Sequence, residues 1–81
     1  MRITIDCFGA SRRWCGAESV ELDLAEPAST AQALDALAQR FPEFAARRAG
    51  VALAIGDAVV SGERRLREGE RLALIPPVSG G

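Results

Sequence analysis

The last two residues of the chain, Gly80 and Gly81, are the ones whose type and position could do chemistry. Glycine has no Cβ, so a chain that ends in two glycines can lie flat in a channel too narrow for other side chains. Such an end presents the α-carboxylate of Gly81 to a partner. A carboxylate is a poor acyl electrophile, but its conversion to an acyl-adenylate supplies a good leaving group. We therefore expect the reacting group to be the main-chain terminus at Gly81.

The segment that carries these glycines consists of Pro76, Pro77, Val78, Ser79, Gly80 and Gly81. The two prolines stiffen its base, and the glycines leave its tip flexible. Fully extended, six residues reach about 20 Å at ~3.3–3.6 Å per residue. The pattern predicts a folded domain over residues 1–75 and a flexible arm over residues 76–81 that inserts into a partner. A frayed terminus, which is common at chain ends, is the alternative.

The side chains offer no comparable site. The sequence has no histidine, and all ten of its basic residues are arginine, so the most common general base is missing. Asp6 and Asp23 could be imagined as a carboxylate pair, but both occupy outward strand positions and we interpret them as solvated. Cys7 and Cys15 match no zinc-site spacing, and we expect them to be small buried apolar side chains. We expect neither a metal site nor a bound cofactor.

Composition and charge narrow the possible partners. At 81 residues, the chain is long enough for one domain with a small core. Its net charge of −1 and its dispersed arginines argue against a nucleic-acid-binding face. It has no apolar run long enough to cross a membrane, and its start is too polar for a signal peptide. We therefore expect a cytoplasmic protein that binds neither nucleic acid nor membrane.

The elements that would position the arm follow from the apolar patterning. Alternation predicts strands over residues 2–8, 19–24, 51–55, 58–60 and 70–75. A helix is predicted between Ser29, which forms a capping box with Gln32, and Phe41, which precedes Pro42. Residues 9–16 and 42–48 each have room for a short helical turn. This order predicts an α+β roll of the β-grasp (ubiquitin-like) type. Its mixed sheet would have about five strands, with the first and last parallel at the centre, and one main helix.

A second feature lies on the outer face of the predicted sheet. Phe8 and Ile75 alternate to the side opposite the inward-facing residues, and they would be neighbours at the root of the arm. Val59 and Val60 cannot both point into the core, and we choose Val59 as the exposed one. An apolar surface beside a protruding arm is typical of a docking site. Scattered exposed apolar residues, which are normal in proteins, are the alternative interpretation.

The residues at both ends of the chain resemble a known family. The ending Arg71–Gly81 (RLALIPPVSGG) resembles that of the small, sulfur-carrying subunit of molybdopterin synthase, which closes with a strand and then Pro-Pro-Val-Ser/Thr-Gly-Gly. The stretch from Phe8 to Gly16, with Arg12 inside it, also resembles that family. The similarity covers essentially the whole chain. The chain departs from the family at Gly56, where asparagine is frequent, and near Arg13, where an acidic residue is frequent.

The resemblance implies a mechanism in molybdenum cofactor biosynthesis. An E1-like activating enzyme would consume ATP to adenylate Gly81, and the adenylate would become a thiocarboxylate. The arm would then insert into the large subunit of a heterotetrameric synthase and donate sulfur to cyclic pyranopterin monophosphate. The resemblance also implies partner contacts at Phe8, Arg12, Val59 and Ile75. The chain would be a sulfur-donating, non-catalytic subunit and not an enzyme by itself.

Three other functions are compatible with the residues. The chain could carry sulfur in another pathway, such as thiamine, tungsten-cofactor or cysteine biosynthesis. It could be a ubiquitin-like modifier whose terminus forms an isopeptide bond with a target lysine. It could also be an interaction domain in which the two terminal glycines are incidental.

Overall fold

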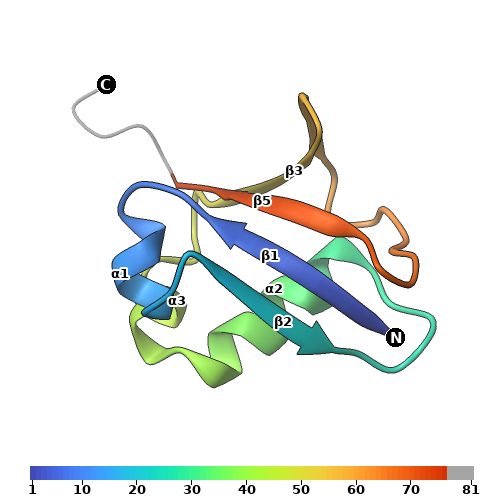
Figure 1. Cartoon of the computed structure of the whole chain (residues 1–81), viewed down its shortest axis with the longest axis horizontal. Helices are drawn as coiled ribbons and strands as arrows, with labels where there is room; N and C mark the ends of the chain where they lie inside the picture. Colours follow the sequence, from blue (N-terminus) through green and yellow to red (C-terminus); the bar gives the residue numbers. More distant parts are fainter. Residues whose placement is uncertain (77–81) are drawn as a thin grey trace.

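A computed structural model of the protein describes residues 1–76, and its sheet is the predicted β-grasp arrangement (Figure 1). The strands are β1 (Arg2–Cys7), β2 (Ser19–Asp23), β3 (Ala52–Ile55), β4 (Ala58–Val60) and β5 (Arg71–Ile75). Their order across the sheet is β2-β1-β5-β3-β4. As predicted, the first and last strands pair in parallel, whereas the other neighbours are antiparallel.

The predicted arm lies mostly outside the described part of the chain. Pro76 is the last described residue. Pro77, Val78, Ser79, Gly80 and Gly81 lie outside the described residues. The division into a domain over residues 1–75 and an arm over residues 76–81 therefore stays a prediction.

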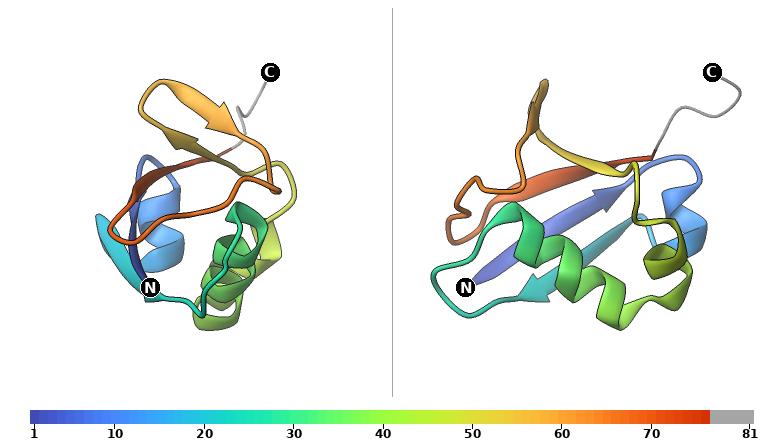
Figure 2. Two further views of the ribbon diagram at one scale, coloured as in Figure 1. Left: turned by 90° about the vertical axis from the view of Figure 1, so that its right-hand side faces the viewer. Right: turned by 180° about the vertical axis from the view of Figure 1, so that it is seen from behind.

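The helices are α1 (Ser11–Cys15), α2 (Thr30–Arg40) and α3 (Pro42–Arg47). The main helix α2 crosses the far face of the sheet in Figure 1 and the near face in the right-hand view of Figure 2. It begins where the sequence indicated, because Gln32 N donates to Ser29 Oγ at 3.2 Å and Ser29 N donates to Gln32 Oε1 at 2.8 Å. None of the helices within residues 1–76 is long and apolar enough to span a bilayer.

The core lies between the sheet and α2. Its fully buried members come from every layer, with Ile3 and Ile5 on β1, Leu72 and Leu74 on β5, and Leu37 on α2. Phe44 of α3 closes one end. Helical spacing in the sequence predicts one apolar stripe on α2: Leu34, Leu37, Ala38 and Phe41. The structure buries Leu37 as predicted, but it also buries Ala33 and leaves the other three half-buried. The small core thus depends on close packing around the two central strands.

The loop that leads into β5 is held by a charged cluster. Arg64 donates to both carboxylate oxygens of Glu70, at 3.0 and 2.9 Å, and the Arg67 amide donates to the same carboxylate at 2.7 Å. The hydrogen bond from Arg64 is the main reason that the pKa of Glu70 is lowered. The Thr30 amide donates to the Arg64 carbonyl at 2.9 Å, which joins this loop to the start of α2. The run of charged residues over positions 64–69 predicts a loop, but no spacing in the sequence indicates this pairing.

Replacing the helix cap should destabilise the domain. We expect Ser29→Ala to lower the free energy of unfolding by about 1 kcal/mol, because the Gln32 amide loses its acceptor. The measurement is urea unfolding followed by circular dichroism. Ser61→Ala, an exposed position, is the control and should change stability by less than about 0.5 kcal/mol. Equal effects of the two variants would contradict the assigned cap.

Candidate functional site

The end of β5 lies in the middle of the sheet, next to the end of β1. Cys7 of β1 is paired with Leu74 of β5 in parallel, so the following residues, Phe8 and Ile75, come side by side. Pro76 follows and is half-buried. β5 therefore ends beside Phe8, as the sequence predicted. Figure 1 shows the end of β5 next to the end of β1.

An apolar surface surrounds this end of β5. Phe8, Val59 and Ile75 are the exposed large apolar side chains within residues 1–76, with 49%, 67% and 37% of their surface accessible. Their exposure confirms the predicted side-chain directions, including the choice of Val59 over Val60. Alanines lie between them, because Ala52 pairs with Ile75 and Ala54 pairs with both Ala73 and Val59. We call this surface the apolar patch: Phe8, Ala52, Val59, Ala73 and Ile75, with Ala54 buried among them at 6% exposed.

The turn after β1 fixes the position of Phe8. Ser11 is completely buried, and its Oγ donates to the Phe8 carbonyl at 2.6 Å. Gly9 adopts a left-handed φ of 56°, which a residue with a Cβ rarely adopts, and its carbonyl accepts from the Arg12 amide at 3.2 Å. Sequence reasoning missed the role of Ser11. A serine two residues after a glycine at a strand end could have indicated it.

Arg12 lies next to the apolar patch. Its Nε donates to the Cys7 carbonyl at 3.4 Å, and its Nη2 lies 3.8 Å from a carboxylate oxygen of Glu18. The Glu18 side chain is 84% exposed, so this ion pair is weak and leaves the guanidinium able to rearrange. Arg12 therefore places a cation near the point where the chain leaves the sheet.

The outer face changes from apolar to charged along β1 and β5. Arg71 donates to both oxygens of Asp6, at 2.7 and 2.9 Å, and this bonding raises the pKa of Arg71. Arg2 similarly donates to Asp23 at 3.0 Å, which lowers the pKa of Asp23. Each aspartate is thus bound to an arginine, and the two do not form a carboxylate pair. The ion pair of Arg71 with Asp6 borders the apolar patch, because Asp6 pairs with Ala73, and it limits the extent of the patch.

The cysteines are inert core residues, as expected. Cys7 and Cys15 are 1% and 5% exposed. Burial raises the pKa of Cys7 to about 12 and also raises the pKa of Cys15. A thiol of such high pKa is almost entirely protonated at neutral pH and is a poor nucleophile. The described residues also contain no group of three His, Cys, Asp or Glu side chains that could hold a metal.

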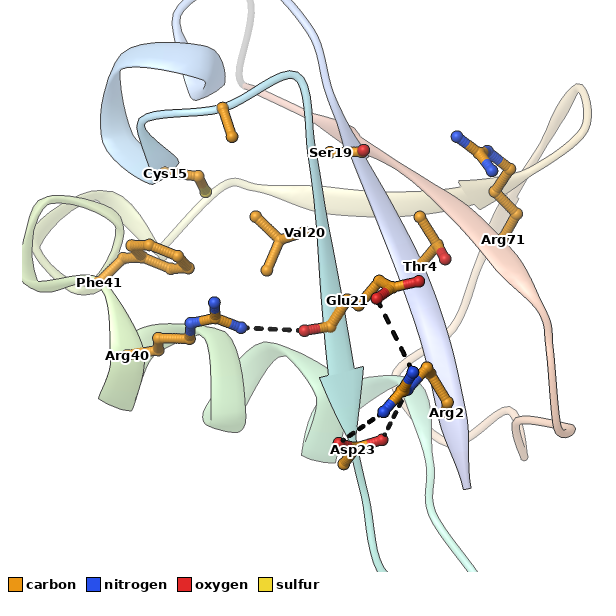
Figure 3. Close-up of a pocket in the computed structure, with 11 residues that line it drawn as sticks. Arg2, Thr4, Cys15, Ser19, Val20, Glu21, Asp23, Arg40, Phe41 and Arg71 are labelled. Carbon is orange, nitrogen blue, oxygen red and sulfur yellow. Dashed lines mark hydrogen bonds and ion pairs between the residues drawn. The ribbon is translucent and has the colours of Figure 1, made fainter.

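A hollow of about 620 Å³ lies elsewhere, along the edge of β2 (Figure 3). Arg40 donates to the Glu21 carbonyl across it at 2.9 Å, and Arg2 faces the carboxylates of both Glu21 and Asp23. Its acidic groups are therefore engaged with arginines, and no residue of the apolar patch lines it. The hollow offers no free general acid or base.

The chain is similar to known proteins over its whole length. The profile of the ThiS family matches residues 5–81. A molybdopterin synthase sulfur carrier subunit from Arabidopsis thaliana is 28% identical over 81 residues, which is 100% of this chain and 84% of the relative.

Solved structures share the fold. Small archaeal modifier protein 1 from Haloferax volcanii superposes with a TM-score of 0.88 at 25% identity, with 100% of each chain covered. A complex of subunits 1 and 2 of the molybdopterin-converting factor from Helicobacter pylori contains a chain that superposes with a TM-score of 0.69. That chain is 22% identical, with 100% of both chains covered, so it shows the fold alone.

The burial of the thiols predicts their chemical behaviour. Incubation of the folded protein with iodoacetamide at neutral pH should leave Cys7 and Cys15 largely unmodified, because few thiolates form and both side chains are covered. In about 8 M urea, which unfolds the core, the same reagent should alkylate both residues within minutes. Mass spectrometry measures the difference. Rapid alkylation of the folded protein would show that a thiol is available for chemistry.

Proposed function

Because this chain belongs to the ThiS family, we propose that it is a ubiquitin-like sulfur carrier and that Gly81 carries the sulfur. The observation that supports this most strongly is the apolar patch at the point where the chain leaves the sheet. A partner that binds Phe8 and Ile75 there would also lie next to the segment that leads to Gly81. Docking and reaction would then use neighbouring parts of the chain.

The proposed chemistry is activation and then substitution at the Gly81 carbonyl carbon. A carboxylate oxygen of Gly81 attacks the α-phosphorus of ATP and displaces pyrophosphate, on an E1-like partner. A sulfur nucleophile then attacks the carbonyl carbon of the acyl-adenylate and displaces AMP. With hydrosulfide as the nucleophile, loss of its proton leaves a thiocarboxylate, and no oxidant or reductant is required. AMP is the leaving group that makes the second step feasible, and no side chain of this chain has to act as a nucleophile.

We further propose that the sulfur goes to molybdenum cofactor biosynthesis. The Arabidopsis relative is named as a molybdopterin synthase sulfur carrier subunit, and the Helicobacter pylori neighbour is a complex of two molybdopterin-converting subunits. In this proposal residues 76–81 enter the large subunit, and Gly81 donates its sulfur to cyclic pyranopterin monophosphate. Two small and two large subunits make the assembly, in the cytoplasm where ATP is available. Arg12 and the exposed residues Phe8, Val59 and Ile75 contact the partners.

A protein modifier is the second candidate, and one observation favours it. The Haloferax volcanii neighbour with the TM-score of 0.88 is named as a modifier protein. In a modifier, the activated Gly81 carbonyl would be attacked by a target lysine instead of by sulfur. This chain contains no lysine, so an activated Gly81 has no lysine within the chain to attack it. The two candidates share the activation step and differ in the bond that forms at Gly81. Carriers of other sulfur pathways would form the same thiocarboxylate and differ in the molecule that accepts the sulfur.

The first experiment is a mass measurement of the product at Gly81. The protein is incubated with ATP, a sulfide source and lysate of its host, and then analysed intact and after fragmentation. We expect a mass increase equal to the exchange of one oxygen for sulfur, located on Gly81. Fragmentation is required because oxidation of Met1, Cys7 or Cys15 adds almost the same mass.

Two controls give the result its meaning. Omitting ATP should abolish the exchange, and deleting Gly81 should leave a chain whose new end remains unmodified. An amide bond between Gly81 and another protein would favour the modifier. An unmodified terminus in the presence of the activating enzyme would contradict both proposals.

The apolar patch should be required for binding to the large subunit. Phe8→Ala and Ile75→Ala should each weaken binding by about tenfold or more, since a central apolar anchor contributes roughly 1.4 kcal/mol or more. The measurement is isothermal titration calorimetry with the large subunit from the same host. Gln39→Ala, on the exposed side of α2, is the matched control and should bind normally. Normal binding by both patch variants would place the docking surface elsewhere.

A further inference from the structure

The sheet has two edges that differ in character. β2 and β4 are the outer strands, so each has one side without a neighbouring strand within residues 1–76. An unpaired edge is a template for another strand unless charge, proline or a covering group blocks it. The two edges can therefore be compared by what protects them.

The edge of β2 is protected. Its outward-facing side chains are Ser19, Glu21 and Asp23, two of which are acidic. The Glu21 carbonyl, which would otherwise accept from an added strand, already accepts from Arg40 at 2.9 Å (Figure 3). Arg2 binds the Asp23 carboxylate beside it. An incoming strand would have to displace these arginine contacts.

The edge of β4 has no such protection in the described structure. Its three residues, Ala58, Val59 and Val60, are uncharged, and Val59 is 67% exposed. Figure 2 shows β4 at the margin of the sheet, and none of the helices covers its outer side. Its length of three residues limits how much pairing it can support, but the edge carries no charge that would oppose another strand.

The backbone N–H and C=O groups of Val59 point away from β3, toward the open edge of the sheet. β3 and β4 are joined by the two-residue turn Gly56-Asp57, and Ile55 pairs with Ala58 directly before and after it. The closing pair of a two-residue hairpin is hydrogen-bonded, so the next pair, Ala54 with Val59, is not. The N–H and C=O of Val59 therefore face outward, and neither has a hydrogen-bond partner within residues 1–76.

We propose that a second copy of this chain pairs with β4 in antiparallel orientation, around a two-fold axis at Val59. The N–H of Val59 in each copy donates to the Val59 carbonyl of the other, which satisfies both groups at once. The two Val59 side chains then lie opposite each other on the outer face, where an apolar cross-strand pair is stabilising. The sequence Ala-Val-Val places no charge in this contact, so the arrangement is self-complementary.

The pairing makes a closed dimer. An isologous contact uses the same edge in both copies, and the protected β2 edges remain at the outside. Two five-stranded sheets become one continuous sheet, and the two apolar patches meet at its centre. Three-residue strands bury well below roughly 1,000 Å², so we expect association only at high protein concentration. This inference rests on the β4 edge and stands independently of the sulfur-carrier proposal.

The test uses variants that separate the backbone of Val59 from its side chain. Val59→Pro removes the outward N–H without removing a bond of the β3–β4 ladder, whereas Val59→Thr keeps the N–H in a side chain of similar shape. Sedimentation velocity at protein concentrations up to about 1 mM measures the dimer fraction. This fraction is large when the dissociation constant of the dimer is about 1 mM or lower. The unmodified chain and Val59→Thr should dimerise, and Val59→Pro should stay monomeric.

Two further measurements keep the test independent of folding defects. The amide of Val59 should exchange with deuterium more slowly as the concentration of the unmodified protein rises. Val59→Lys keeps the N–H but places like charges opposite each other, so its dimer should be lost at low salt and regained at high salt. A chain that stays monomeric at about 1 mM, or a Val59→Pro variant that still dimerises, would overturn the proposal.

Discussion

The parallel pairing of β1 with β5 is the contact on which the other features depend. It joins residues about as far apart as the described chain allows, with Asp6 and Arg71 separated by 65 positions. The pairing buries Ile3, Ile5, Leu72 and Leu74 together in the core. Because side chains alternate along a strand, the same register sends Phe8 and Ile75 to the opposite face. A shift of β1 by one residue would bury Phe8 and expose Ile3 and Ile5, so the core and the apolar patch are fixed together.

The outer face combines this register with small side chains. Ala52, Ala54 and Ala73 lie between the larger exposed residues, so no bulky side chain projects from these three positions. The ion pair of Arg71 with Asp6 then marks the boundary at which the face becomes polar. A partner would thus meet an apolar surface of limited extent with charges on one side, a common composition for a protein interface. The helices on the other face leave this surface uncovered (Figure 2).

Local patterns in the sequence predicted most of the fold. The capping box at Ser29, the alternation in β1 and β5, and the exposure of Val59 depend on neighbouring residues and were correct. Contacts that depend on tertiary register were missed. The buried hydroxyl of Ser11 and the pairing of Asp6 with Arg71 need strands and turns already in place, and no spacing in the sequence specifies them. The predicted apolar stripe of α2 was correct at Leu37 but missed Ala33, which is also buried.

The central position of β5 also has a consequence for synthesis of the chain. β5 is the last strand to be made, yet it provides the inner neighbour of both β1 and β3. Until residues 71–75 have left the ribosome, β1 and β2 can form only an isolated hairpin, which is marginally stable by itself. The nascent chain must therefore wait until residues 71–75 have emerged before its sheet can close. Folding then occurs as one late, cooperative event that is dominated by contacts distant in sequence.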